Sequence, residues 1–178
     1  MAEAALERRP ESPGALRFLS ELRRRAADVE ASMALLEKLV ASGRGTSFDH
    51  NNLVWCSLFM DPIPEQALDH ARRAVGAGSS EAALHTLAVV HAELGQTGEA
   101  LEIFRKLLDS RGQADPEPHD WYIMGRLAEH YGEPELARDM YARVEPDEDE
   151  DLDRTSTRHL ADRRIAALDS RRAELLGR

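Results

Sequence analysis

"WYIMGRLAEHYGEPELARDMY", residues 121–141, is the stretch that decides the fold. Trp121 and Met124 begin an apolar pattern with the period of a helix, which predicts one amphipathic helix. Gly132 ends that helix and Pro134 begins a second one, because glycine is favoured directly after a helix and proline in its first turn. The stretch therefore predicts a helix, a tight turn and a second helix.

The same pattern occurs three times along the chain. One copy lies 37 residues upstream and a more degenerate copy lies 33 residues further upstream. The matched positions are Trp121, Met124, Gly125, Ala137, Tyr141 and Val144, then Leu84, Leu87, Ala88, Ala100, Phe104 and Leu107, and then Asn51, Val54, Trp55, Ala67, Ala71 and Ala74. In the earlier copies Thr97 and Pro64 begin the second helix. A helical hairpin is therefore the repeated unit.

These residues resemble the tetratricopeptide repeat (TPR), in which a large residue is followed by Leu-Gly, a glycine before the second helix, and alanine with an aromatic residue four positions later. "WYIMG…YGEPELARDMY" and "LHTLA…LGQTGEALEIF" match that pattern, and "NLVW…DPIPEQALDHA" is degenerate. The similarity covers about residues 48–145. It implies an all-α, TPR-like helical-hairpin solenoid of about three repeats, at residues 48–80, 81–117 and 118–145.

The resemblance also implies a binding site, because the first helices of successive repeats line a concave groove in this family. The partner-binding positions carried over to this chain are Asn52, Phe59, His85, Val89, Tyr122, Arg126, Glu129 and His130. Trp121 and Met124 are then expected to fill the space between helices, and Gly125 is expected to let a neighbouring helix approach. An alternative is that Phe59 and its neighbour Met60 only cover the N-terminal helix. Without lysines at these positions, a receptor for a C-terminal carboxylate is not expected.

The N-terminal flank is divided between residues 1–12, expected to be disordered, and residues 13–43, expected to form a long amphipathic helix or a helical pair. Apolar residues repeat every seven positions in two offset series, which is an a/d seam over four heptads. The series are Ala15, Leu22, Val29 and Leu36, and Leu19, Ala26, Met33 and Val40. This helix is either a packed cap of the solenoid or an arm that pairs with a second copy in a homodimer.

The C-terminal flank begins with an acidic linker, residues 146–153, within "EPDEDEDLD". Like charges at this density repel and extend the chain, and the spacing lacks the features of a calcium-binding EF-hand. Residues 154–178 are expected to form an arginine-rich capping helix. Its expected solvated residues are Arg158, Arg163, Arg164 and Arg171. The alternative is that these arginines form a basic docking surface.

The chain contains no motif that predicts catalysis, a metal centre or a cofactor. None of the seven histidines falls in the H-E-x-x-H spacing or a comparable ligand spacing. His119 and His130 would share one helix face if both lay on one helix, but a surface pair explains them without a metal. Cys56 is the only cysteine and lies in an apolar run typical of a buried side chain. We therefore expect a protein that is not an enzyme and binds no metal or cofactor.

Composition narrows the classes of partner. The net charge of −10 opposes unspecific binding to nucleic acid, because contacts to phosphates need a basic surface. No run of eighteen apolar residues predicts a membrane span, and the charged start lacks the apolar region of a secretion signal. Arginine in place of lysine, with abundant alanine, is typical of a GC-rich bacterial genome. The expected location is the cytoplasm of a bacterium.

Three functional hypotheses follow. The first is a non-catalytic adaptor or scaffold that binds a protein or peptide partner in the concave groove. The second is a self-assembling structural protein that forms a homodimer through the N-terminal helix. The third is the TPR tail of a larger enzyme.

Overall fold

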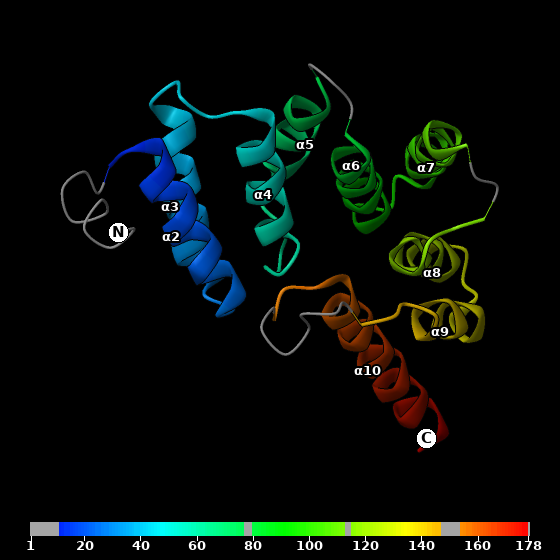
Figure 1. Ribbon diagram of the computed structural model, residues 1–178. Helices are drawn as coiled ribbons and strands as arrows, with labels where there is room; N and C mark the ends of the chain where they lie inside the picture. Colours follow the sequence, from blue (N-terminus) through cyan, green and yellow to red (C-terminus); the bar gives the residue numbers. More distant parts are fainter. Residues whose placement is uncertain (1–10, 77–79, 113–114, 147–153, 178) are drawn as a thin grey trace. The chain divides into compact units, whose positions relative to one another are not determined.

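The computed structural model describes residues 11–76, 80–112, 115–146 and 154–177, and the regular secondary structure of this part of the chain is entirely helical (Figure 1). The all-α prediction is confirmed, and none of these helices is long and apolar enough to cross a membrane. The helices are α2 (Pro13–Arg25), α3 (Val29–Ala41), α4 (Ser47–Ser57), α5 (Ala67–Val75), α6 (Glu81–Glu93), α7 (Thr97–Arg111), the 3₁₀ helix η1 (Pro118–Asp120), α8 (Trp121–His130), α9 (Pro134–Ala142) and α10 (Thr157–Leu176). Residues 1–10 of the expected disordered N-terminus and residues 147–153 of the expected acidic linker lie outside the described residues.

The chain divides into two compact units. Unit 1 consists of Met1–Thr86 with Asp151–Thr155, and unit 2 consists of Leu87–Glu150 with Ser156–Arg178. The boundary falls within α6 and so divides the second expected repeat, residues 81–117.

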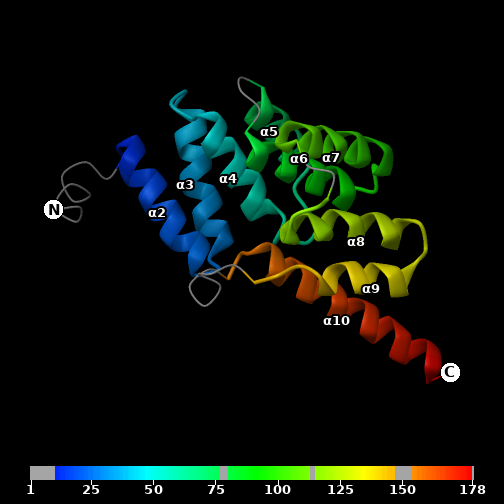
Figure 2. The same cartoon turned by 45° about the vertical axis from the view of Figure 1, so that its right-hand side comes forward.

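The N-terminal segment of unit 1 is a pair of helices, α2 and α3, and not one continuous helix (Figure 2). Ala27 between them has a φ of 60°, in the left-handed region, and the Asp28 side chain accepts a hydrogen bond from the Ala31 backbone N–H at 3.3 Å. This N-cap begins α3 in a new direction, so that α2 and α3 pack against each other. Of the predicted seam, Val29, Met33 and Leu36 are buried in the core of unit 1, whereas Leu22 is 49% exposed.

An ion pair joins α2 to the start of α4 in unit 1. Thr46 and Asp49 form a capping box at the first turn of α4. The fully buried Asp49 carboxylate also accepts two hydrogen bonds of 2.7 Å from the Arg17 guanidinium. Burial alone would raise the pKa of Asp49, but the bonds from Arg17 and Thr46 outweigh burial and lower it. Asp49 therefore stays ionised and holds two helices in register.

Unit 1 also contains a short segment from much later in the chain. The Trp55 indole N–H donates to the Thr155 carbonyl oxygen at 2.6 Å, and the Arg24 Nη1 donates to the Thr155 hydroxyl at 2.6 Å. Thr155 is 1% exposed. These bonds attach the start of the C-terminal segment to α2 and α4.

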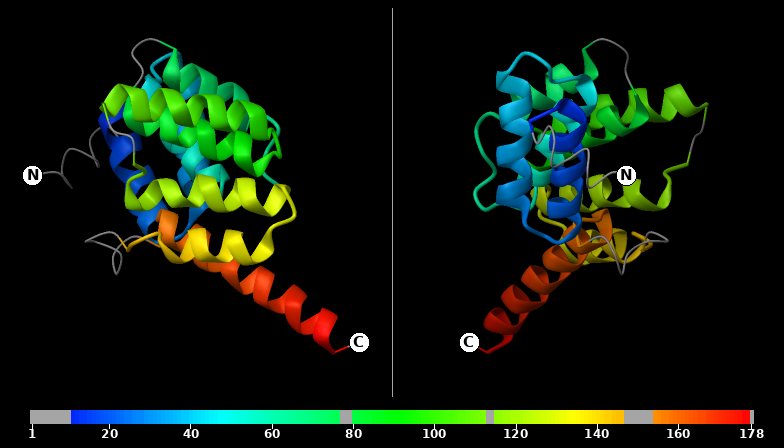
Figure 3. Two further views of the ribbon diagram at one scale, coloured as in Figure 1. Left: turned by 90° about the vertical axis from the view of Figure 1, so that its right-hand side faces the viewer. Right: turned by 60° about the vertical axis from the view of Figure 1, so that its left-hand side comes forward.

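In unit 2 the stretch 121–141 forms the expected hairpin of α8 and α9 (Figure 3). Gly132 in the turn has a φ of 79°, which a residue with a side chain rarely adopts. Gly125 of α8 faces the Tyr141 ring of α9, and a Cβ atom at this position would lie 2.4 Å from a ring carbon. The predicted close approach of the two helices at Gly125 is therefore present.

Candidate functional site

The face of α8 that is buried differs from the face that the resemblance implies. Tyr122 and Arg126, expected to line the concave groove, are only 1% and 5% exposed. The Tyr122 hydroxyl donates to Glu93 Oε1 at 2.5 Å, and the Tyr122 ring lies 5.5 Å from the Tyr141 ring. Trp121, expected in the interior, is half-buried beneath the Arg143 guanidinium, which lies 4.6 Å from the ring centre. Tyr122 is thus the aromatic residue that packs the interior of the hairpin.

Arg126 is held by carboxylates from two helices. Its Nε lies 2.9 Å from Glu93 Oε1 of α6, and its Nη1 lies 3.0 Å from Glu129 Oε1 one turn later on α8. Neither nitrogen meets the angle of a hydrogen bond, so these contacts are ion pairs without good directionality. Burial alone would lower the pKa of Arg126, but Glu93 and other neighbours raise it above its usual value. Arg126 is therefore a buried cation at the centre of unit 2.

Glu129 receives a second cation from α10. The Arg164 Nε and Nη2 donate to its two carboxylate oxygens at 2.9 and 2.5 Å, and the Tyr141 hydroxyl donates at 2.6 Å. Burial favours a raised pKa for Glu129, but the hydrogen bonds from Arg164 and Tyr141 and the charge of Arg126 outweigh it and lower the pKa to about 2. The expectation that Arg164 is solvated is wrong, because a buried carboxylate on α8 holds it.

His130, next to these residues, contacts the end of α6. Its Nε2 lies 2.8 Å from the Ala92 carbonyl oxygen, and because a carbonyl only accepts, the imidazole is the donor. The ring also fills the space beside Gly95, where a Cβ atom would lie 3.2 Å from the imidazole carbon Cε1. His130 thus binds the carbonyl end of α6.

Apart from His130, which is exposed, these residues form a largely buried polar cluster that joins α6, α8, α9 and α10. Its members are Glu93, Tyr122, Arg126, Glu129, Tyr141 and Arg164. The negative charges of its two carboxylates balance the positive charges of its two guanidinium groups. A carboxyl group with a pKa of about 2 is a poor proton acceptor at neutral pH, so Glu129 is not suited to general acid or base catalysis. The cluster is suited to fixing the positions of four helices.

The remaining predicted binding residues are also largely inside the fold. Phe59 and Met60 pack against the core cluster of unit 1. This contact agrees with the alternative that the two residues cover the N-terminal helix. His85 is 6% exposed, and its ring lies 6.3 Å from the Trp55 ring in the same unit. Val89 of unit 2 is fully buried. Asn52 on α4 is half-buried. A binding role for these positions stays a prediction.

Two histidine contacts were not foreseen in the sequence. In unit 1 the Nδ1 atoms of His50 on α4 and His70 on α5 lie 2.7 Å apart, and the rings stack with their centres 4.9 Å apart. Burial, followed by the neighbouring positive charge, lowers the pKa of both histidines. A hydrogen bond at this distance needs one donor and one acceptor, so at least one of the two rings is neutral. The lowered pKa values favour the state in which both rings are neutral.

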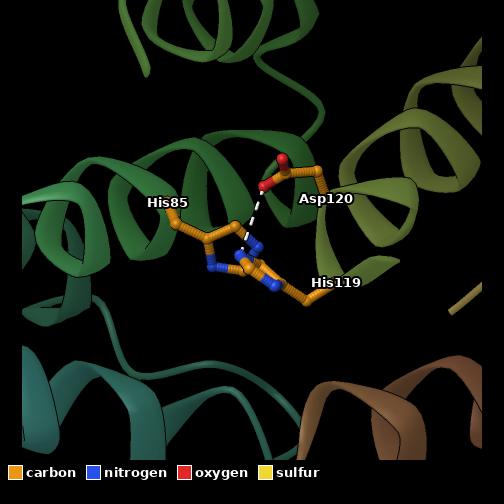
Figure 4. A group of neighbouring side chains, drawn as sticks. All are labelled: His85, His119 and Asp120. Carbon is orange, nitrogen blue, oxygen red and sulfur yellow. Dashed lines mark ion pairs between the residues drawn. The ribbon is translucent and has the colours of Figure 1, made fainter. Parts of the chain in front are cut away.

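The second contact lies in unit 2 at η1. His119 Nε2 is 3.5 Å from Asp120 Oδ1 (Figure 4). The fully buried Asp120 carboxylate also accepts hydrogen bonds from the Arg111 Nη1 at 2.6 Å and from the Glu117 backbone N–H at 2.9 Å. Asp120 therefore anchors the end of α7 to the start of α8. His85, also drawn in Figure 4, belongs to unit 1.

A groove that the sequence did not predict lies between α9 and α10 in unit 2, and the predicted binding residue Glu129 is part of its lining. It has a volume of about 360 Å³, and its apolar lining consists of Gly132, Pro134, Leu168 and Leu175. Two exposed ion pairs border it: Arg138 Nε to Asp169 Oδ1 at 2.9 Å, and Arg172 Nη1 to Glu135 Oε1 at 3.3 Å. The sequence did contain a signal, because Leu168 and Leu175 stand seven residues apart on one helix face. We refer to this site as the α9–α10 groove.

The comparisons with known proteins assign no family to these features. The chain matches no family model, no curated protein and no solved structure.

Proposed function

We propose that this chain is a non-catalytic adaptor or scaffold of TPR-like helical hairpins, which binds a helical segment of a protein partner in the α9–α10 groove. The groove is the observation that carries the proposal. It offers apolar side chains from α9 and α10 beside two ion pairs that join these helices. A helix with an apolar face and charged edges is the ligand that such a surface suits.

The TPR-like architecture is supported by residues at the hairpin seams. Ala67, Ala71 and Ala74 of α5 are at most 2% exposed, and α5 packs against α4. Gly125 and Ala137 occupy the corresponding seam of α8 and α9. The resemblance alone would place the partner on the first helices. Because Tyr122 and Arg126 are buried, the α9–α10 groove is the better candidate.

The buried polar cluster supports a role without catalysis. Its ionisable groups are bound to one another, and Glu129 keeps its negative charge at neutral pH.

Affinity capture with a groove variant tests the proposal. The tagged chain is added at nanomolar concentration to an extract of the cells that produce it, beside Leu168→Glu in the groove and Leu101→Glu on α7. Leu101 is 43% exposed and lies outside the groove, so its substitution is the matched control. We expect Leu168→Glu to lose partners that Leu101→Glu retains, with circular dichroism unchanged. Identical partner sets for both variants would contradict the groove as the binding site.

A further inference from the structure

The second half of α10 exposes an apolar surface next to the α9–α10 groove. Leu175 and Leu176 are 73% and 79% exposed, the highest values among the exposed large hydrophobic residues of the described chain. α10 has 20 residues and α9 has nine, so at 1.5 Å per residue α10 is about 16 Å longer. Figure 3 shows the end of α10 extending past α9 within unit 2. No described part of unit 2 covers these leucines.

Two charges on the same segment are unpaired. Within the described residues, Arg171 and Glu174 form no ion pair, although the neighbouring Arg172 and Asp169 both do. Arg171 lines the groove, and Glu174 lies one turn later on the same edge of the helix. The segment therefore carries one free cation and one free anion three residues apart, beside an apolar stripe.

We propose that the occupant of the α9–α10 groove is the second half of α10 from a second copy of this chain, paired antiparallel about a twofold axis. This inference rests on the proposed function only in taking the groove as a helix-binding surface. In a twofold contact each residue pair occurs twice, so the surface must be complementary to itself.

One register satisfies both the apolar and the charged residues. When Arg171 of one copy faces Glu174 of the other, Leu168 lies close to Leu175 of the other copy. The reciprocal contacts follow from the twofold axis. Because Leu168 and Leu175 are seven residues apart, they share the face that the copy covers, and Arg171 and Glu174 lie along one edge of that face. Arg171, Glu174 and the exposed Leu175 thus each acquire a partner.

The contact is small, since each copy contributes only the last turns of one helix and one end of the groove. Interfaces of this size are typical of weak, transient association. We therefore expect a concentration-dependent equilibrium of monomer and dimer in the micromolar range.

Sedimentation velocity of the full chain over a series of concentrations tests the pairing. We expect the wild-type chain to form a dimer, and Leu175→Glu to stay monomeric. Arg171→Glu and Glu174→Arg each place like charges in contact, so each is expected to weaken association by about tenfold or more. The double variant Arg171→Glu, Glu174→Arg restores opposite charges and is expected to recover the dimer.

Leu101→Glu on α7 is the control for removing an exposed leucine elsewhere in unit 2, and circular dichroism verifies folding. A wild-type chain that stays monomeric at every concentration would overturn the pairing. So would a dimer that Leu175→Glu leaves intact, or a double variant no better than the single ones. A monomeric chain whose partner capture still depends on Leu168 would overturn only this inference. A dimer with partner capture independent of Leu168 would instead overturn the adaptor role.

Discussion

Removing the negative charge of Glu129 should destabilise unit 2 with little change in the shape of the side chain. Its side chain is only 7% exposed and lies between Arg126 and Arg164. Glu129→Gln keeps the size of the side chain and removes the charge. Both guanidinium groups then lose their shared counter-ion within a largely buried cluster.

The size of the expected loss in the free energy of unfolding follows from the pKa of Glu129. Its pKa falls from an ordinary value of 4.5 to about 2 in the folded chain. Since each pKa unit corresponds to about 1.4 kcal/mol, the ionised state contributes about 3 kcal/mol to stability at neutral pH. Breaking a buried ion pair by removing one partner costs a similar amount, about 3–5 kcal/mol. We therefore expect Glu129→Gln to lower the free energy of unfolding by about 3 kcal/mol at neutral pH.

Urea denaturation followed by circular dichroism measures this loss, with Glu135→Gln as the control. The Glu135 side chain is 70% exposed in its pair with Arg172, so its loss should change stability by at most about 0.5 kcal/mol. A lowered folded pKa gives stability that is present above pH 4.5 and is lost as the pH falls towards 2. The difference between wild type and Glu129→Gln should therefore shrink over that range. A loss below about 1 kcal/mol, or one equal to that of Glu135→Gln, would refute this reasoning.

Two further predictions concern the hairpin seams. Gly125→Ala places a methyl group against the buried Tyr141 ring and should destabilise the chain by about 1–3 kcal/mol in the same urea assay. Gly98→Ala on α7 meets nothing within 4 Å and should be neutral or stabilising, and equal effects of the two variants would contradict the close packing. The pKa values of His50 and His70 are lowered from 6.5 in the folded chain. The neutral histidine pair therefore stabilises the folded chain above pH 6.5, and this stabilisation is lost as the pH falls through the lowered pKa values. The melting temperature of the wild type should fall on acidification from about pH 7.5 to 5.5, and His50→Gln should reduce the slope, whereas an unchanged slope would exclude the pair as its cause.

The sequence by itself determined the local structure of this chain. Gly132 and Pro134 specify the turn between α8 and α9 because each restricts the backbone of its own position. Gly125 marked the close approach of a neighbouring helix. The helical period and the composition were enough to predict an all-α protein, since these signals depend on residues within one or two turns of each other.

Only the tertiary structure decided which side of each helix is buried and what its charges contact. Trp121 and Tyr122 are adjacent, so the helical period alone did not determine which one faces the interior. Which of the two faces the interior depended on Glu93, 29 residues away, which accepts a hydrogen bond from the Tyr122 hydroxyl. Arg164 was likewise expected in solvent because its partner Glu129 lies 35 residues away on another helix.

The α9–α10 groove has the same origin. Its apolar lining comes from two helices separated by the acidic segment, and the sequence reveals only the stripe on α10. Helix propensity and capping act within one helix, so they can be predicted from the sequence. Charge pairing and shape between helices depend on contacts across tens of residues, so they exist only once the chain has folded.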